Sequence, residues 1–116
     1  MALPTDVGEV ALERVRLFCV ERTPTDEPSE IRLECSVRGN SITIVERRPP
    51  WSEVVGAVWT SMKIAQLRYD DRSRLWTLYC IDRNERWWPY DFVEPSGDVE
   101  ELLAALDDDP SGIFWG

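Results

Sequence analysis

Two runs of alternating residues, joined by a two-residue turn, constrain this chain most strongly. Over residues 30–38, charged or polar side chains alternate with apolar ones at Ile31, Leu33, Cys35 and Val37. Gly39 and Asn40 then form a typical hairpin turn, and the alternation resumes over 41–47 with Ile42 and Ile44. A period of two places the apolar residues on one face of a strand. We therefore predict a half-buried β-hairpin over residues 30–47.

Three further strands are predicted over residues 62–69, 75–81 and 87–92, with polar turns at 70–74 and 82–86. Ala65, Leu67 and Tyr69 would share one face of the first of these strands. The segment 48–56 contains adjacent prolines, which cannot donate hydrogen bonds to a sheet, so we expect it to be irregular. The strands after it would form a three-strand meander.

Helices are predicted at both ends of the chain. Asp6 and Glu9 resemble a capping box that opens a helix running to about Arg22, with apolar residues at helical spacing (Val7, Val10, Ala11, Val15 and Phe18). Asp98 and Glu101 resemble a second capping box, before a helix that Pro110 would end. The fold class that follows is α+β in a single domain, residues 1–116. Its five-stranded antiparallel sheet, a hairpin plus a three-strand meander, would be flanked by the N-terminal and C-terminal helices.

The chain ends on an apolar run, Ile113, Phe114 and Trp115. Chain ends fray unless they dock, and an exposed run of this kind favours aggregation. We predict that these three residues fold back between the second helix and the sheet.

Composition excludes several chemistries. The chain has no histidine, no phosphate-binding glycine loop and no CxxC motif, so we expect no metal site and no cofactor. Cys19, Cys35 and Cys80 lie apart among apolar neighbours, which is typical of reduced thiols in the cytoplasm. No apolar run approaches the about 20 residues of a membrane span, and the N-terminus lacks the features of a secretory signal.

Charge is unevenly distributed along the chain. The net charge is −9, and no basic residue follows Arg86 although acidic residues continue to the end. An acidic surface repels phosphate, so we expect no direct binding of nucleic acid. The acidic end favours either simple solubility or a basic protein partner.

Six tryptophans are too many for the core of so small a domain. Trp87 and Trp88 are adjacent on a predicted strand and must face opposite sides of the sheet. If the helices cover only one side, one of this pair lies on the open side near Tyr79, where an exposed aromatic patch would be a recognition surface. Trp51, after two prolines, would be a second anchor or a plug over the core edge. We expect at least one of Trp51, Trp87 and Trp88 to be exposed.

These features favour a non-enzymatic, cytoplasmic protein-interaction module with an aromatic recognition face. Its candidate binding residues are Arg47, Trp51, Tyr79, Asp82, Arg83, Trp87 and Trp88. One alternative is a small enzyme or ligand-binding domain that uses Glu46, Arg47, Asp82 and Arg83 beside an aromatic cleft. Another is an acidic mimic of nucleic acid that binds a basic protein.

Three blocks of the sequence, RGNSITIVERRPPW, LRYDDRSRLWTLYCIDRNERWWPY and DPSGIFWG, resemble a family of small bacterial proteins, domain of unknown function 3024. The resemblance covers nearly the whole chain and implies its boundaries. It supplies no mechanism, since the family has no established activity. Glu85 stands where the resemblance implies a glycine, after Asn84 in the turn between two aromatic strands.

Overall fold

The computed structural model describes residues 4–23, 31–50 and 58–115. Five strands form one antiparallel sheet in the sequential order β1-β2-β3-β4-β5. The elements are α1 (Thr5–Arg22), β1 (Arg32–Arg38), β2 (Ser41–Arg48), β3 (Thr60–Asp70), β4 (Leu75–Ile81), β5 (Trp87–Pro89) and α2 (Val99–Asp108). The predicted α+β fold, with a helix before and a helix after a five-stranded antiparallel sheet, is confirmed.

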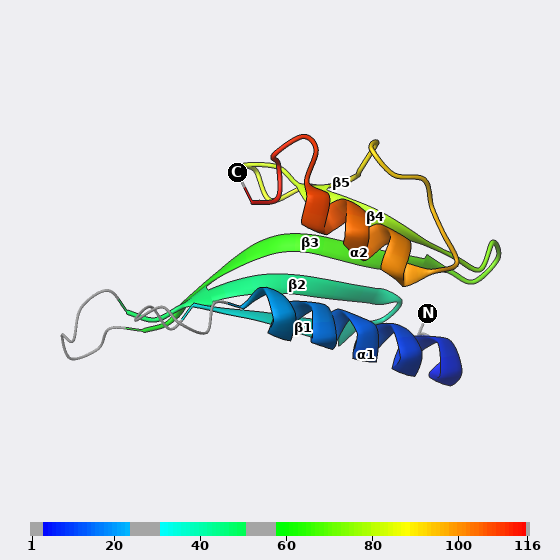
Figure 1. Ribbon diagram of the computed structural model, residues 1–116, viewed down its shortest axis with the longest axis horizontal. Coiled ribbons are helices and arrows are strands. Elements are labelled where there is room, and N and C mark those ends of the chain that lie inside the picture. Colours follow the sequence, from blue (N-terminus) through cyan, green and yellow to red (C-terminus); the bar gives the residue numbers. More distant parts are fainter. Residues whose placement is uncertain (1–3, 24–30, 51–57, 116) are drawn as a thin grey trace.

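Both helices lie on the same face of the sheet (Figure 1). α1 packs mainly on β1, α2 packs on β4, and the two helices contact each other. The opposite face contacts neither helix, because every buried side chain of β2 and β4 shares one side of its strand. The fold therefore has two layers, and the outer face of the sheet is left open among the described residues.

The core lies between the two layers. Its fully buried members come from the three inner strands and both helices: Val15, Ile42, Ile44, Leu67, Trp76, Leu78, Leu102 and Leu106. α1 buries Ala11, Val15 and Cys19, which recur every four residues. The predicted apolar stripe of this helix is thus displaced, because Val10 is exposed and Cys19 takes part instead.

A β-bulge interrupts the pairing of β2 with β3. Ile44 pairs with Ala65 and Val45 pairs with Lys63, so Ile64 is the extra residue. A bulge lets two successive residues point to the same side of a strand, and both Ile64 and Ala65 are buried. The bulge therefore adds a second core side chain near the start of the long strand β3.

Three local predictions are wrong in detail. α1 begins at Thr5, and Pro4 at the N-cap position provides no side-chain cap, because its ring has no hydrogen-bond acceptor; the Pro4 carbonyl accepts the first helical bond, from Gly8 N–H. Asp6 therefore lies inside the first turn, where its charge favours the helix dipole. β5 ends at Pro89 instead of residue 92, although Tyr90 N–H still donates to the carbonyl of Leu78 at 2.8 Å. Val37 is exposed at the edge strand, beside the hairpin turn.

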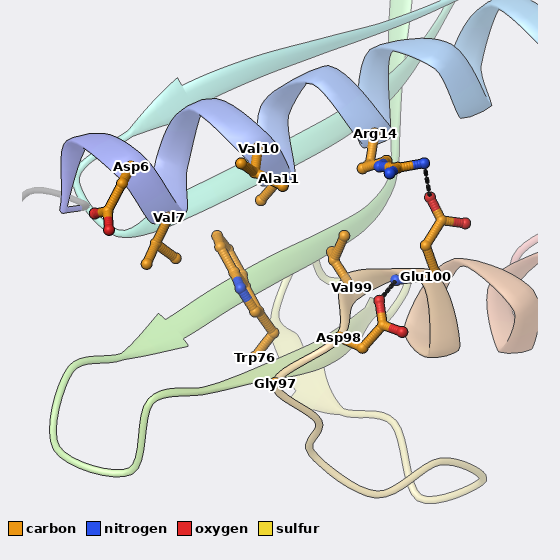
Figure 2. A pocket seen from close by; sticks show the side chains of 10 residues that line it. All are labelled: Asp6, Val7, Val10, Ala11, Arg14, Trp76, Gly97, Asp98, Val99 and Glu100. Atoms are coloured by element: carbon orange, nitrogen blue, oxygen red, sulfur yellow. Dashed lines mark hydrogen bonds and ion pairs between the residues drawn. The ribbon is translucent and has the colours of Figure 1, made fainter.

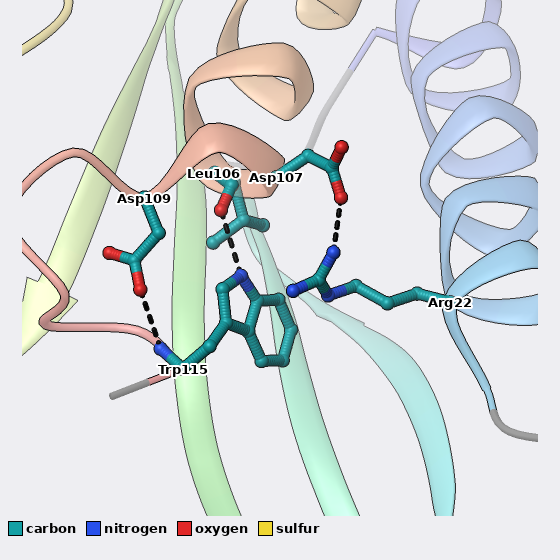
Figure 3. A network of polar contacts seen from close by, with 5 residues as sticks. All are labelled: Arg22, Leu106, Asp107, Asp109 and Trp115. Atoms are coloured by element: carbon teal, nitrogen blue, oxygen red, sulfur yellow. Dashed lines mark hydrogen bonds and ion pairs between the residues drawn. The ribbon is translucent and has the colours of Figure 1, made fainter.

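The C-terminal tail packs largely as predicted. Phe114 is 6% exposed, and its ring centroid lies 4.7 Å from that of Tyr90. The Trp115 indole N–H donates to the carbonyl of Leu106 at 2.8 Å (Figure 3). The prediction is wrong for Ile113, which is 50% exposed, because the turn after α2 directs only the two aromatic side chains inward.

Candidate functional site

The open face of the sheet is the surface opposite the helices, and strand register assigns its residues. It gathers the cations Arg32, Arg38, Arg47, Lys63 and Arg68, against the carboxylates Glu34 and Asp70. The register also places Tyr79, Ile81 and Trp87 on this face. In a chain with a net charge of −9, the described strands thus present one locally basic surface interleaved with aromatic side chains.

A row of polar side chains crosses the centre of this face. The Gln66 amide donates to the Thr43 hydroxyl at 2.9 Å, and Arg68 Nε donates to the Gln66 amide oxygen at 2.6 Å. Arg68 also stacks on Tyr79, with its Cζ 4.0 Å from the ring centroid. These contacts fix the guanidinium in one orientation while its terminal amino groups keep their capacity to donate.

Two further arginines lie beside Trp59, just before the start of β3. The Arg32 and Arg47 Cζ atoms lie 5.2 and 5.7 Å from the centroid of the indole ring. Arg47 also lies 3.6 Å from a carboxylate oxygen of Glu34, while its buried Nε has no hydrogen-bond partner among the described residues. The guanidinium has further N–H groups besides these with which it can donate to an acceptor.

Adjacent tryptophans of β5 face opposite sides, as the sequence predicted. Trp87 pairs with Ile81 and joins the open face beside Tyr79, while Trp88 pairs with the core residue Cys80. Trp88 lies beyond the cover of the helices and is 54% exposed. The expectation that at least one of the named tryptophans is exposed is therefore confirmed; Trp51 lies outside the described residues.

An apolar corner surrounds Trp88 on the helix side of the sheet. Trp88, Phe92 and Ile113 are all at least half exposed, and they line a hollow of about 670 Å³ with Tyr90 at its base. The corner joins β5 to the C-terminal tail. It carries one carboxylate, Asp91, and no cation, so its charge gives little selectivity for a partner.

Asp82 builds the turn between β4 and β5. Its carboxylate accepts from the backbone N–H groups of Asn84 and Arg86 and from the indole N–H of Trp88 at 2.9 Å. The hydrogen bond from the Trp88 indole contributes most to lowering the pKa of Asp82 below its usual value. A carboxylate committed to three local donors is poorly placed to act as a general base.

The structure does not assemble the predicted polar cluster into one site. Arg47 pairs with Glu34, and Glu46 on the helix side of β2 pairs with Arg48 at 2.6 Å. Arg83 instead lines a cavity of about 450 Å³ with Lys63, Glu85 and the tail. In the described part of the chain, no hydrogen bond or ion pair joins Glu46 or Arg47 to Asp82 or Arg83.

A groove of about 520 Å³ separates the first half of α1 from the start of α2. Figure 2 shows Trp76 rising into it from the sheet, between Val7 and Val99. Three of the polar groups on its rim are engaged locally: Asp98 caps α2 through Glu100 N–H, and Arg14 lies 3.7 Å from Glu100. Asp6 is the remaining carboxylate of the lining, and the lining holds no serine, cysteine or lysine that it could activate.

The comparisons with known proteins identify a family. The family model described as domain of unknown function (DUF3024) matches residues 4–116. The chain belongs to this family. No curated protein and no solved structure matches it.

Two further findings concern metals and membranes. Among the described residues, no group of three histidine, cysteine, aspartate or glutamate side chains could hold a metal ion. None of the helices in those ranges is long and apolar enough to span a membrane.

Sequence reasoning selected Arg47, Tyr79 and Trp87 on the open face but missed Arg32, Trp59, Lys63 and Arg68. The missed signal was present in the alternation of the strands. The polar positions of a half-buried strand form one surface, and three of the four polar positions in the run Arg32–Arg38 are charged. Considering these positions together across neighbouring strands would have indicated a basic face.

Proposed function

We propose that this chain is a non-enzymatic protein-binding module whose open sheet face recognises an acidic segment of a partner protein. The concentration of five cations against two carboxylates on that face supports the proposal. Charge complementarity steers partners and selects among them. Because the rest of the surface is acidic, only a segment aligned with this face would be attracted.

The geometry of the arginines favours carboxylates as their ligands. Arg68 is held by Gln66 and by stacking on Tyr79, and Arg32 and Arg47 flank Trp59. A guanidinium fixed in this way loses little entropy when it binds a carboxylate through two parallel hydrogen bonds. The same stacking covers the aromatic rings, which single-stranded nucleic acid would need as platforms for its bases.

The two alternatives have weaker support. Catalysis by Asp82 would compete with the three hydrogen bonds that its carboxylate accepts in the turn. Mimicry of nucleic acid would use the carboxylates of α2 and the tail, which include Glu100, Asp107 and Asp108. We also infer a cytoplasmic location, because the three cysteines are unpaired.

A binding assay with short labelled peptides tests the proposal. Five strands about 4.8 Å apart span about 20 Å, which an extended segment of about six residues matches. Fluorescence anisotropy of labelled hexaglutamate should therefore rise with protein concentration, and added salt should weaken the binding. The double variant Arg47→Glu, Arg68→Glu should weaken binding by at least about tenfold, since each charge-assisted bond contributes more than 1 kcal/mol.

Charge reversal elsewhere provides the matched control. Arg14→Glu on α1 makes the same change on the opposite layer and should leave hexaglutamate binding nearly unchanged, with circular dichroism confirming the fold of each variant. Equal losses for all variants would contradict the proposal. If the protein binds labelled oligothymidine and not hexaglutamate, nucleic acid is the better candidate ligand. If it binds hexalysine and not hexaglutamate, mimicry of nucleic acid is the better candidate function.

A further inference from the structure

We propose that Cys19 and Cys35 form a modification site: a reversible disulfide that joins α1 to β1 when the protein meets a peroxide. Cys19 lies on the buried side of α1, and Cys35 lies on the helix-facing side of the edge strand β1. Cys35 packs against the buried cluster that includes Cys19, and each thiol is close enough to shift the pKa of the other. Two thiols that approach from different elements in this way can be joined by a disulfide.

A second contact fixes the two elements beside this pair. The Thr23 hydroxyl donates to the Cys19 carbonyl at 2.7 Å and accepts from Leu33 N–H at 3.2 Å. It therefore ties the last turn of α1 to β1, two residues before Cys35. Because this tie constrains both backbones, the thiols can remain close without movement of the helix.

The surroundings of the two thiols differ in a way that suits sequential chemistry. The pKa of Cys35 is lowered to about 7, chiefly by hydrogen bonding with Cys19 and further by the positive charge of Arg16. Burial acts in the opposite direction and raises this pKa. The same hydrogen bond, together with burial, raises the pKa of Cys19. Cys35 is also the more exposed of the two. It is therefore the thiolate that meets the oxidant, and Cys19 is the thiol that resolves the product.

The reaction balances with hydrogen peroxide as the co-reactant. The Cys35 thiolate attacks one peroxide oxygen, the O–O bond breaks, and hydroxide leaves to give a sulfenic acid at Cys35. The Cys19 sulfur then attacks the Cys35 sulfur, the S–O bond breaks, and water leaves. Two thiols and one peroxide thus give one disulfide and two waters, and a dithiol reductant reverses the change.

Cys80 provides an internal comparison within the same fold. Burial raises its pKa, and its thiol lies 3.5 Å from the carbonyl oxygen of Trp88. Among the described residues, no hydrogen bond joins the Cys80 thiol to another cysteine. We therefore expect Cys80 to remain reduced while the other two cysteines react.

Mass spectrometry of the full chain tests the proposal. After treatment with one equivalent of hydrogen peroxide, the protein should lose two hydrogens, and peptide mapping should find Cys19 linked to Cys35 with Cys80 free to alkylate. Before oxidation, Cys35 should alkylate with iodoacetamide at least about tenfold faster than Cys80 at pH 7, because its thiolate fraction is larger. Dithiothreitol should restore all three thiols.

Serine variants separate the roles of the two cysteines. Cys19→Ser should form no disulfide and should accumulate a sulfenic acid at Cys35, which dimedone traps; Cys35→Ser should lose the fast alkylation. Cys80→Ser should behave like the unmodified chain. Oxidation that is equal at all three cysteines, a disulfide that includes Cys80, or no disulfide in the folded protein would overturn the proposal.

Discussion

The guanidinium of Arg22 lies over the indole ring of Trp115, with its Cζ 4.1 Å from the ring centroid. The same guanidinium pairs with Asp107 at the end of α2 (Figure 3). One arginine in the last turn of α1 therefore contacts both the second helix and the tail. The contact supplies a cation near the C-terminal end of α2, whose own last turn has no basic residue.

Truncation of Phe114 should destabilise the domain strongly. Its side chain is buried and packs on Tyr90, so Phe114→Ala leaves a cavity and should lower the free energy of unfolding by about 3 kcal/mol. Urea denaturation followed by tryptophan fluorescence measures the change. Ile113→Ala is the matched control in the same tail, and its half-exposed side chain should cost less than about 1 kcal/mol. Equal effects of the two variants would contradict the packing of the tail.

Asp109 should be the residue that turns the tail back onto α2. It adopts a left-handed conformation with φ 44°, and its carboxylate accepts from Phe114 N–H at 3.2 Å and Trp115 N–H at 2.8 Å. Asp109→Ala removes both acceptors and should lower the free energy of unfolding by about 2 kcal/mol. Asp109→Asn keeps one acceptor oxygen and tolerates the left-handed conformation, so calorimetry should find a smaller loss. An equal loss would contradict this role of the carboxylate.

Much of the fold could be predicted because its signals are local. Alternation located β1 and β2 to within about two residues, and the turn residues Gly39 and Asn40 fixed their pairing. The bulge at Ile64 could not be predicted, since it depends on how β3 fits two neighbouring strands and the core at once. The start of α1 was misplaced because Asp6 and Glu9 matched a capping motif, whereas the helix begins at Thr5 with Pro4 at the N-cap position.

The candidate site was less accessible to sequence reasoning because it is assembled from distant segments. Arg68 and Tyr79 are eleven positions apart in the sequence, and only the pairing of β3 with β4 brings them into contact. The proximity of Cys19 and Cys35 likewise depends on how α1 packs on β1. Because the members of each pair are separated in the sequence, the sequence alone did not indicate that they lie close together.

Replacement of Glu85 by glycine should stabilise the turn between β4 and β5. Glu85 has φ 60°, a left-handed conformation that costs a residue with a Cβ about 1 kcal/mol. Its backbone N–H donates to the Asp82 carbonyl at 3.0 Å, a bond that glycine retains. Glu85→Gly should therefore raise the melting temperature, although the greater freedom of glycine in the unfolded chain offsets part of the gain. Glu94→Gly, at an exposed position without positive φ, should lower it or leave it unchanged.

The hydrogen bond from Trp88 to Asp82 should make stability depend on pH in the acid range. The pKa of Asp82 is lowered from 3.8, chiefly by this bond. A carboxyl group with a lowered pKa in the folded state contributes stability that is present above its unfolded pKa. That contribution is lost as the pH falls from about 4 through the lower folded value. Asp82→Asn should therefore flatten the dependence of the free energy of unfolding on pH below about 4.

Substitution of the two neighbouring tryptophans distinguishes this bond from a general effect of the turn. Trp88→Phe removes the indole donor, so the pKa of Asp82 should rise toward its ordinary value in a carboxyl-detected NMR titration. Trp87→Phe changes the other face of β5 and should leave that pKa unchanged. The backbone N–H groups of Asn84 and Arg86 remain in both variants. If the two variants shift the pKa equally, the backbone of the turn, and not the Trp88 side chain, stabilises the ionised form of Asp82.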